Sequence, residues 1–264
     1  MNHSLSEQQI NGYRQDGFLL VEDFLNESEL AVWRESIDEA MNKREGRRLP
    51  FDESDPGKKA GNEHVFTQRI NLWMDHPGVK KLMIDERIGK MAARLEGVDG
   101  IRVWHDQALV KEPWANPTAW HQDNTKWSFS SQHAITIWIA LDEANLQNGC
   151  MFFLPGTQSR RLEQDFATIE SVGSLFRAYP DLANRDPVAA ILPAGGCSFH
   201  NGLMVHAAHA NMTPRTRRAM TCAFMPDGSR YNGTRNVLPE ALADTLQIGD
   251  LLVDDEQNPL IYHE

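Results

Sequence analysis

One His-x-Asp triplet, formed by His121, Gln122 and Asp123, stands out in the 264-residue sequence. It follows a proline-containing loop, residues 111–118, at the point where a strand would begin. Side chains two residues apart on an extended chain point to the same side, so the imidazole and the carboxylate can reach one metal ion. Trp120 and Trp127 flank the triplet, and each is either a wall of a pocket or part of the packed interior.

A second group of histidines, His200, His206 and His209, lies in the segment HNGLMVHAAHAN. If strands flank the tight turn at Asn201 and Gly202, several of these imidazoles come close together. Two histidines and one carboxylate form the facial triad of non-haem Fe(II) oxygenases, which leaves coordination positions open. A bidentate 2-oxo acid and O2 can occupy these positions. The residue types therefore predict an Fe(II) site completed by a histidine of the second group.

An arginine cluster follows the histidines, formed by Arg215, Arg217 and Arg218. An oxygenase that uses 2-oxoglutarate needs a cation for the far carboxylate of that cosubstrate, and the planar guanidinium of arginine binds a carboxylate with two hydrogen bonds. On a strand that begins near Arg217, residues 217 and 218 face opposite ways, so at most one of them points inward. The alternative is a solvated basic turn between strands.

The overall charge limits the classes of partner. Lysine and arginine number 26 and aspartate and glutamate 37, a formal charge of −11. This balance argues against nucleic acid and against an anionic membrane as partners, because both attract a basic surface. A hydrophobic fraction of 41% and a charged fraction of 24% indicate a folded globular protein.

The cysteines and the N-terminus indicate the compartment. Cys150, Cys197 and Cys222 form no Cys-x-x-Cys motif and have apolar neighbours, so we expect buried, reduced thiols. The first ten residues lack the features of a secretory signal, and the best apolar run, residues 134–141, is too short to span a membrane. We therefore expect a cytoplasmic protein.

The elements that must position these residues change in type near residue 100. Before it, the patterns predict helices: one from a capping box at Ser6 to Gly17, one capped by Asn26, and one over residues 77–97, with a short strand at 18–21. The polar segment 44–63 is expected to be a long loop, either a lid over a site or a surface excursion.

After residue 100 the patterns predict short strands of branched and aromatic residues separated by turns. The expected strands are residues 101–110, 133–141, 150–154, a region beginning at 191, and 220–225, with a helical or irregular insertion at 162–179. Helices followed by many short strands predict one antiparallel β-sandwich or barrel with a helical layer outside.

Five segments, taken together, resemble the phytanoyl-CoA dioxygenase family of Fe(II)- and 2-oxoglutarate-dependent oxygenases. In chain order they are GFLLVEDFL, QALVKEP, WHQD, TIWIALDEANLQNGCMFFLPGTQ and HNGLMVHAAHANMTPRTRRAM. The resemblance implies a mainly β fold with α-helices: a double-stranded β-helix (jelly roll, cupin-like) core with helices packed outside. It implies a single domain over residues 1–264, in which residues 1–100 are largely a helical cover and residues 101–225 form most of the jelly roll.

The resemblance also assigns roles to individual residues. His121 and Asp123 match the family's His-x-Asp and His206 its distal histidine, so these three are expected to bind Fe(II) and to form the catalytic centre. An arginine follows the distal histidine by eleven positions in the family, which selects Arg217 for the far carboxylate of 2-oxoglutarate. His200 is then a pocket residue or supports a ligand from behind.

Further positions match residues that hold 2-oxoglutarate in the family. These are Trp138, Gln107 and Arg69, although Arg69 could instead meet the substrate. Two positions depart from the family pattern: Ala207 stands where the family has glycine, and Ala208 where it has a small hydroxyl residue that contacts the cosubstrate. Neither departure removes a metal ligand.

The resemblance implies a dioxygenase that uses Fe(II), 2-oxoglutarate and O2 to hydroxylate an unactivated C–H bond of a small molecule, with CO2 and succinate as co-products. The carboxylate of Asp123 argues against halogenation, because related halogenases have a small residue there. The alternatives are desaturation, epoxidation or ring expansion at the same site, and a non-redox cupin-like metal-binding protein. We expect no nucleic acid or membrane partner, and the pattern leaves the substrate and the oligomeric state open.

Overall fold

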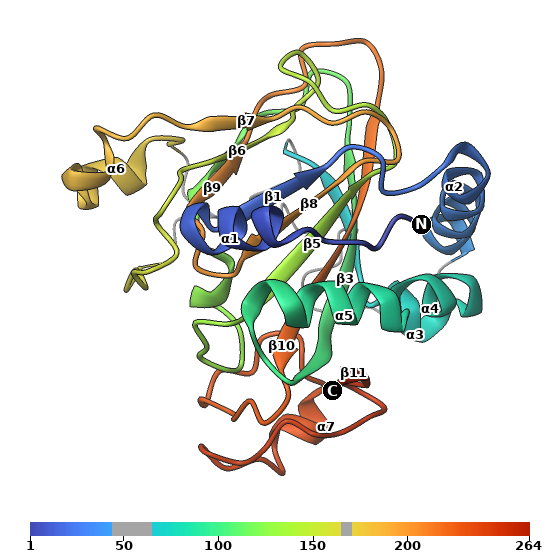
Figure 1. Ribbon diagram of the computed structural model, residues 1–264, viewed down its shortest axis with the longest axis vertical. Helices are drawn as coiled ribbons and strands as arrows, with labels where there is room; N and C mark the ends of the chain where they lie inside the picture. Colours follow the sequence, from blue (N-terminus) through green and yellow to red (C-terminus); the bar gives the residue numbers. More distant parts are fainter. Residues whose placement is uncertain (44–64, 165–170) are drawn as a thin grey trace, which may run out of the picture.

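Two antiparallel sheets form the centre of the computed structural model, which describes residues 1–43, 65–164 and 171–264 (Figure 1). The larger sheet runs in the order β1 (Phe18–Val21), β8 (Cys197–Asn201), β5 (Ile135–Ala140), β10 (Arg217–Pro226), β3 (Gly100–Lys111) and β11 (Leu260–His263), and β2 (Thr67–Ile70) also pairs with β3. The smaller sheet runs in the order β4 (Thr118–His121), β9 (His206–Ala208), β6 (Met151–Phe153) and β7 (Val188–Ala190). The expected jelly roll with helices outside is confirmed.

Alternating side chains give the larger sheet two different faces. On β5, Ile135, Ile137 and Ile139 belong to the main apolar core, whereas Thr136 and Trp138 line a cavity between the two sheets. Successive side chains of a strand point to opposite faces, which explains this pattern. The outer face is therefore free to carry helices while the inner face holds polar groups.

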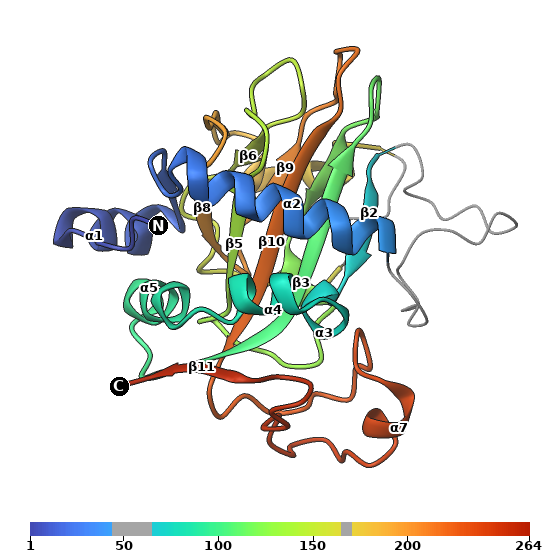
Figure 2. The same cartoon turned by 90° about the vertical axis from the view of Figure 1, so that its right-hand side faces the viewer.

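Helices from the first third of the chain cover the outer face of the larger sheet (Figure 2). Trp33, Ile37 and Ile88 of these helices are buried in the same cluster as Ile137 and Phe199 of the sheet. Burial of apolar surface stabilises such a layer by about 25 cal/mol per Å². The covering helices are α1 (Glu7–Asp16), α2 (Glu27–Lys43), α3 (Leu72–Asp75), α4 (Pro77–Met83) and α5 (Glu86–Glu96).

The first two helices begin as the sequence predicts. Ser6 and Gln9 form the capping box of α1, and Gly17, with a φ of 84°, ends that helix. At the start of α2, the side-chain oxygen of Asn26 accepts a hydrogen bond from the backbone N–H of Glu29 at 3.0 Å.

The prediction of one continuous helix over residues 77–97 is wrong, because the chain breaks after α4. Ile84 leaves the helical conformation with a φ of −94° and a ψ of 61°. Asp85 then caps α5, and its carboxylate accepts a hydrogen bond from the backbone N–H of Arg87 at 2.9 Å. A short polar side chain that binds the backbone in this way favours a new helix start over continuation of the old helix.

Most strand predictions after residue 100 correspond to β3, β5, β6 and β10. Only the start of the strand region expected from residue 191 is wrong: β7 ends at Ala190, Leu192 forms an isolated bridge with Ala144, and the strand of this region, β8, begins at Cys197. The predicted loop 44–63 lies outside the described residues. The insertion at 162–179 is described except for residues 165–170, and its ordered part contains α6 (Ser174–Ala178). None of the helices in the described ranges is both long and apolar enough to cross a membrane.

The segment after β10 contributes Asn236 and Val237 to the wall of the cavity. It contains α7 (Glu240–Ala243), and isolated bridges join Phe129 to Tyr231 and Arg230 to Leu251. The chain then returns to the larger sheet as β11, beside the start of β3. The two short 3-10 helices are η1 (Asp123–Thr125) and η2 (Pro180–Leu182).

Candidate metal centre and cosubstrate pocket

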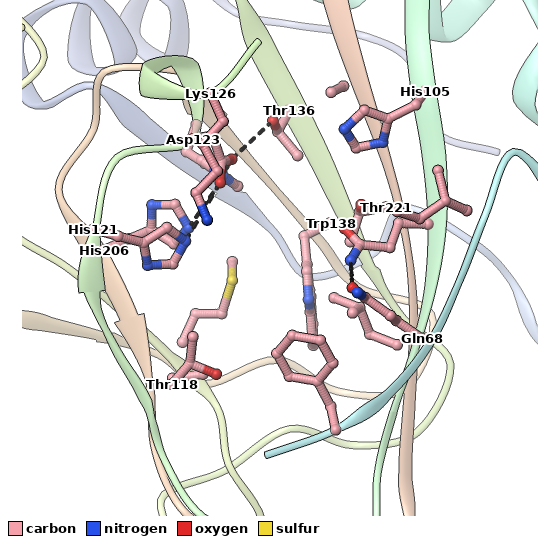
Figure 3. A pocket seen from close by; sticks show the side chains of 18 of the residues that line it. Gln68, His105, Thr118, His121, Asp123, Lys126, Thr136, Trp138, His206 and Thr221 are labelled. Carbon is pink, nitrogen blue, oxygen red and sulfur yellow. Dashed lines mark hydrogen bonds and ion pairs between the residues drawn. The ribbon is translucent and has the colours of Figure 1, made fainter. Parts of the chain in front are cut away.

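Three side chains that could bind a metal ion converge on the inner side of the smaller sheet (Figure 3). His121 on β4 and His206 on β9 are directly paired in the antiparallel ladder. Asp123 follows β4 at the start of η1. Nε2 of His121 lies 3.4 Å and Nε2 of His206 lies 3.7 Å from Oδ1 of Asp123. Ligand atoms of all three lie within 4.8 Å of one another.

The backbone fixes the proton positions of both histidines. Nδ1 of His121 lies 2.8 Å from the carbonyl oxygen of Ala119, and Nδ1 of His206 lies 3.0 Å from that of Met204. A carbonyl only accepts, so each Nδ1 carries a proton, and Nε2 is the nitrogen whose lone pair is available to a metal. Both lone pairs thus face the carboxylate, as they do in histidines whose second nitrogen binds a metal.

Burial and neighbouring charges shift the pKa values of two of these groups, His206 and Asp123, toward the forms that bind a metal. Burial and the neighbouring His121 lower the pKa of His206 to about 3. Burial acts to raise the pKa of Asp123, but the surrounding histidines outweigh it and hold that pKa well below its usual value. A divalent cation takes the place of protons between such groups and can be bound by the carboxylate and both Nε2 atoms. The residues therefore fit an Fe(II) ion.

Two further groups hold the carboxylate from behind. Oγ1 of Thr136 and Nε2 of His200 each lie 3.4 Å from Oδ2 of Asp123, the oxygen turned away from the other two ligands. His200 is buried on β8, whereas His209 is exposed. The second histidine group therefore divides into one candidate ligand, one residue that positions Asp123, and one surface residue.

Arg217 lies at the far end of the same cavity. Its side chain is buried, and Nη2 donates to the carbonyl oxygen of Gly149 at 3.1 Å. Within the described ranges, Nε and Nη1 are buried without a hydrogen-bond partner. Burial lowers the pKa of Arg217 to about 10, so the group remains positive at neutral pH. A buried guanidinium with unpartnered donors fits the carboxylate of a bound ligand.

The rest of the arginine cluster points elsewhere. Arg218 lies on the outer face, where it forms ion pairs with Asp142 at 2.9 Å and with Asp38 of α2 at 2.6 Å. Arg215 is exposed in the turn before β10. The alternation expected from residue 217 onward is therefore present.

The remaining predicted cosubstrate residues differ in position. The ring of Trp138 faces Arg217, whose guanidinium carbon lies 5.2 Å from the ring centroid. Gln107 lines the cavity and donates a hydrogen bond to the side chain of Gln68. Arg69 does not line the cavity: it lies between Gln68 and Ile70 on β2, and these two neighbours line it instead. The structure thus brings Gln68, rather than Arg69, to the other members of the predicted set.

Lys111 is a cavity residue that the sequence motifs do not identify. It is fully buried at the end of β3, beside Arg217 in the strand ladder. Its sequence signal is the strand period of two, because Gln107, Leu109 and Lys111 all line the cavity. Ala207 and Ala208 line the same cavity with methyl groups, so they add no polar contact.

The opposite end of the cavity is mostly neutral. Its wall includes His105, Trp127, Ala223, Asn236 and Val237, and the whole cavity has a volume of about 240 Å³. Burial lowers the pKa of His105 to about 4, so its ring is uncharged at neutral pH. The cavity therefore has a cationic end at Arg217 and a mostly uncharged wall around His105, and Lys126 lies beside Asp123 of the candidate metal ligands (Figure 3).

Comparison with known proteins gives a family match over most of the chain. The profile of the phytanoyl-CoA dioxygenase (PhyH) family matches residues 13–219. The chain is 28% identical over 228 residues to methylphosphonate hydroxylase of Gimesia maris, a match that covers 85% of this chain and 82% of the relative. It is 22% identical over 259 residues to phytanoyl-CoA dioxygenase of Arabidopsis thaliana, covering 86% of this chain and 92% of the relative.

Two solved structures from nogalamycin biosynthesis are similar over 97% of this chain. The non-heme alpha ketoglutarate dependent carbocyclase SnoK has a TM-score of 0.79 and 28% identity, with 96% of its chain covered. The epimerase SnoN, in complex with Fe3+, alpha ketoglutarate and nogalamycin RO, has a TM-score of 0.77 and 26% identity, with 98% covered.

Proposed function

The chain belongs to the phytanoyl-CoA dioxygenase family and is an Fe(II)- and 2-oxoglutarate-dependent dioxygenase, and we propose that it hydroxylates an unactivated C–H bond of a small molecule. One observation carries the proposal: a cavity holds three converging lone-pair donors and, at its far end, a buried arginine with unpartnered N–H groups. CO2 and succinate are the expected co-products.

In this proposal each cavity residue has a defined task. His121, Asp123 and His206 hold Fe(II), while Arg217 binds the far carboxylate of 2-oxoglutarate beside Trp138. The bound iron and cosubstrate together supply an oxidant made from O2, which the protein side chains cannot provide. The chain's own part is to orient the cosubstrate and to keep water from the reacting groups.

The neutral end of the cavity supports a site for the substrate. Trp127, Ala223 and Val237 offer an apolar wall, and His105 and Asn236 offer uncharged polar groups. A substrate with a hydrocarbon part beside a neutral polar group fits such a wall. A C–H bond held there would lie next to the metal centre.

A second candidate outcome uses the same site without adding a hydroxyl group. It is favoured by the similarity to a carbocyclase and an epimerase, at TM-scores of 0.79 and 0.77. Desaturation, epoxidation and ring expansion belong to the same class of oxidative outcome. A non-redox cupin-like role is less well supported, because such a protein does not need the buried Arg217.

We also propose that residues 1–264 act as one domain in the cytoplasm, without a nucleic acid or membrane partner. β1 and β11 come from opposite ends of the chain and pair within one sheet, which supports a single unit. The net charge of −11 and the free, buried cysteines support the proposed surroundings.

Anaerobic titration tests the proposed function. Full-length protein with Fe(II) and 2-oxoglutarate should develop a visible charge-transfer band, and Asp123→Ala or Arg217→Ala should weaken it. A substrate screen read by succinate formation then identifies the substrate, and product mass separates hydroxylation from the other outcomes. If the wild-type protein binds no iron and develops no band, the proposed function is wrong.

A further inference from the structure

Two cationic side chains occupy the end of the cavity, although the family resemblance accounts for only one of them. Lys111 on β3 and Arg217 on β10 are direct partners in the antiparallel ladder. Their exposed fractions are 0% and 4%. Both line the cavity that contains the candidate metal ligands. Two like charges buried side by side are costly unless an anion joins them.

The partners of both cations are neutral. Nζ of Lys111 donates to the carbonyl oxygens of Val65 at 3.1 Å and Asn116 at 2.7 Å, which uses two of its three N–H bonds. Arg217 donates to one carbonyl oxygen and has two buried nitrogens without a partner among the described residues. Neither cation forms an ion pair with a carboxylate in the described ranges. Both therefore retain donors for a negatively charged ligand.

A glycine with an unusual backbone conformation, Gly149, leaves space for the side chain of Lys111. Gly149 has a φ of 92°, and a Cβ there would lie 2.4 Å from Cδ and 2.8 Å from Cε of Lys111. Any other residue at 149 would collide with the lysine and would also be strained. The side-chain amide of Asn211 donates to the carbonyl oxygens of Lys111 and Arg215, which joins the end of β3 to the turn before β10.

We infer that Lys111 is a second cation for the far carboxylate of 2-oxoglutarate, and that with Arg217 it selects dicarboxylic over monocarboxylic 2-oxo acids. This inference rests on the proposed function, since it concerns the same cosubstrate. Lys111 touches the ligand in this proposal and is a binding residue.

The charge of Lys111 then depends on the ligand. Burial, followed by the charge of Arg217, lowers the pKa of Lys111 to about 7. Burial raises the pKa of the nearby Cys150 thiol to about 11, so that group is neutral. Glu112 is directed to Thr216, from which it accepts a hydrogen bond at 3.3 Å. A carboxylate placed beside Lys111 raises its pKa again, so binding takes up a proton above pH 7.

Ligand discrimination tests the inference in Fe(II)-loaded, full-length protein without O2. The two ligands are 2-oxoglutarate and 2-oxopentanoate, a five-carbon 2-oxo acid with a methyl group in place of the far carboxylate. Lys111→Met should weaken 2-oxoglutarate binding by about 10- to 100-fold and leave 2-oxopentanoate binding nearly unchanged. Calorimetry and the charge-transfer band measure both affinities. Lys90→Met, a change in an exposed lysine of α5 outside the cavity, is the control and should leave the binding of both ligands unchanged.

Proton uptake tests the same inference without a variant. At pH 8, wild-type protein should take up about one more proton on binding 2-oxoglutarate than on binding 2-oxopentanoate. Calorimetry in buffers of different ionisation enthalpy measures the difference. Protons released or taken up where the 2-oxo acid end binds the metal are the same for both ligands and cancel in this difference. Equal uptake, or equal weakening of both ligands by Lys111→Met, would overturn the role of Lys111. Failure of wild-type protein to bind 2-oxoglutarate at all would instead overturn the proposed function.

Discussion

At the scale of single residues, hydrogen bonds to the backbone decide what the metal centre can bind. The carbonyl groups of Ala119 and Met204 hold the Nδ1 protons of His121 and His206, which leaves both Nε2 atoms facing Asp123. Such outer contacts orient ligands before any metal arrives. The centre is therefore preorganised by groups that never touch the ion.

His200 gives a test of this preorganisation. Its Nε2 lies 3.4 Å from Oδ2 of Asp123, so His200→Ala should free the carboxylate and weaken Fe(II) binding by about 10- to 100-fold. Anaerobic competition with a chromophoric chelator measures the affinity. His209→Ala, at an exposed position, is the matched control. Equal Fe(II) affinity in wild type and His200→Ala would contradict a positioning role.

His105 makes the free energy of unfolding depend on pH. Its pKa is lowered to about 4 in the folded protein, chiefly by burial, so the unfolded chain binds this proton first as the pH falls. The free energy of unfolding should decrease between about pH 6.5 and pH 4, by up to about 1.4 kcal/mol per pH unit from this group. Above this pH window, the contribution of His105 to the free energy of unfolding is complete.

Urea denaturation of metal-free protein at several pH values measures this effect. The difference between wild type and His105→Gln isolates one histidine from the other titrating groups. The variant should have a shallower pH dependence across the window. Parallel curves for the two proteins would rule out the burial of a neutral His105 as the cause.

At the scale of elements, the strand period distributes the arginines of β10 to different tasks. Arg217 points into the cavity, and Arg218 points outward to Asp142 and to Asp38 of α2. One is placed to bind a ligand, and the other joins a helix to the sheet. Neighbouring residues of the same type thus have separate effects.

Matched substitutions separate these effects. Arg217→Met should raise the dissociation constant for 2-oxoglutarate by about 10- to 100-fold without loss of stability, because it removes a buried charge that has no carboxylate partner among the described residues. Arg218→Met should lower the free energy of unfolding by about 1 kcal/mol, since its ion pairs are partly exposed, and leave 2-oxoglutarate binding unchanged. Calorimetry and urea denaturation measure the two quantities, and the opposite assignment of effects would contradict the inward and outward directions.

At the scale of the whole molecule, the cavity combines the family region with a segment outside it. The family match ends at residue 219, whereas Asn236 and Val237 line the neutral end of the cavity. Asn236 has a φ of 43°, and its Oδ1 is buried without a partner among the described residues. Strain and an unused acceptor in a cavity wall are typical of a ligand-binding position.

Asn236→Ala tests this position once a substrate is known. It should raise the KM for the substrate by about 5- to 100-fold, because a hydrogen bond to the substrate is lost, and should leave 2-oxoglutarate binding unchanged. Succinate formation measures the first quantity and the charge-transfer band the second. If Asn236→Ala changed only the binding of 2-oxoglutarate, Asn236 would not be a substrate-binding residue.

The sequence by itself determined the features that depend on neighbouring residues. The capping box at Ser6, the shared side of His121 and Asp123, and the opposite directions of Arg217 and Arg218 follow from local geometry. With the family resemblance, these patterns were enough to predict the fold and the class of enzyme. The break at Ile84 was missed because an apolar pattern on both sides of Asp85 resembles one helix.

Only the tertiary structure decided which side chains lie opposite one another on paired strands. The three histidines near residue 200 are close along the chain, and the pairing of β4 with β9 places His206 opposite His121 while His200 lies behind Asp123. Lys111 gained its significance in the same way, from the pairing of β3 with β10. Strand register depends on contacts between distant parts of the chain, and a shift by one residue would turn each of these side chains to the other face.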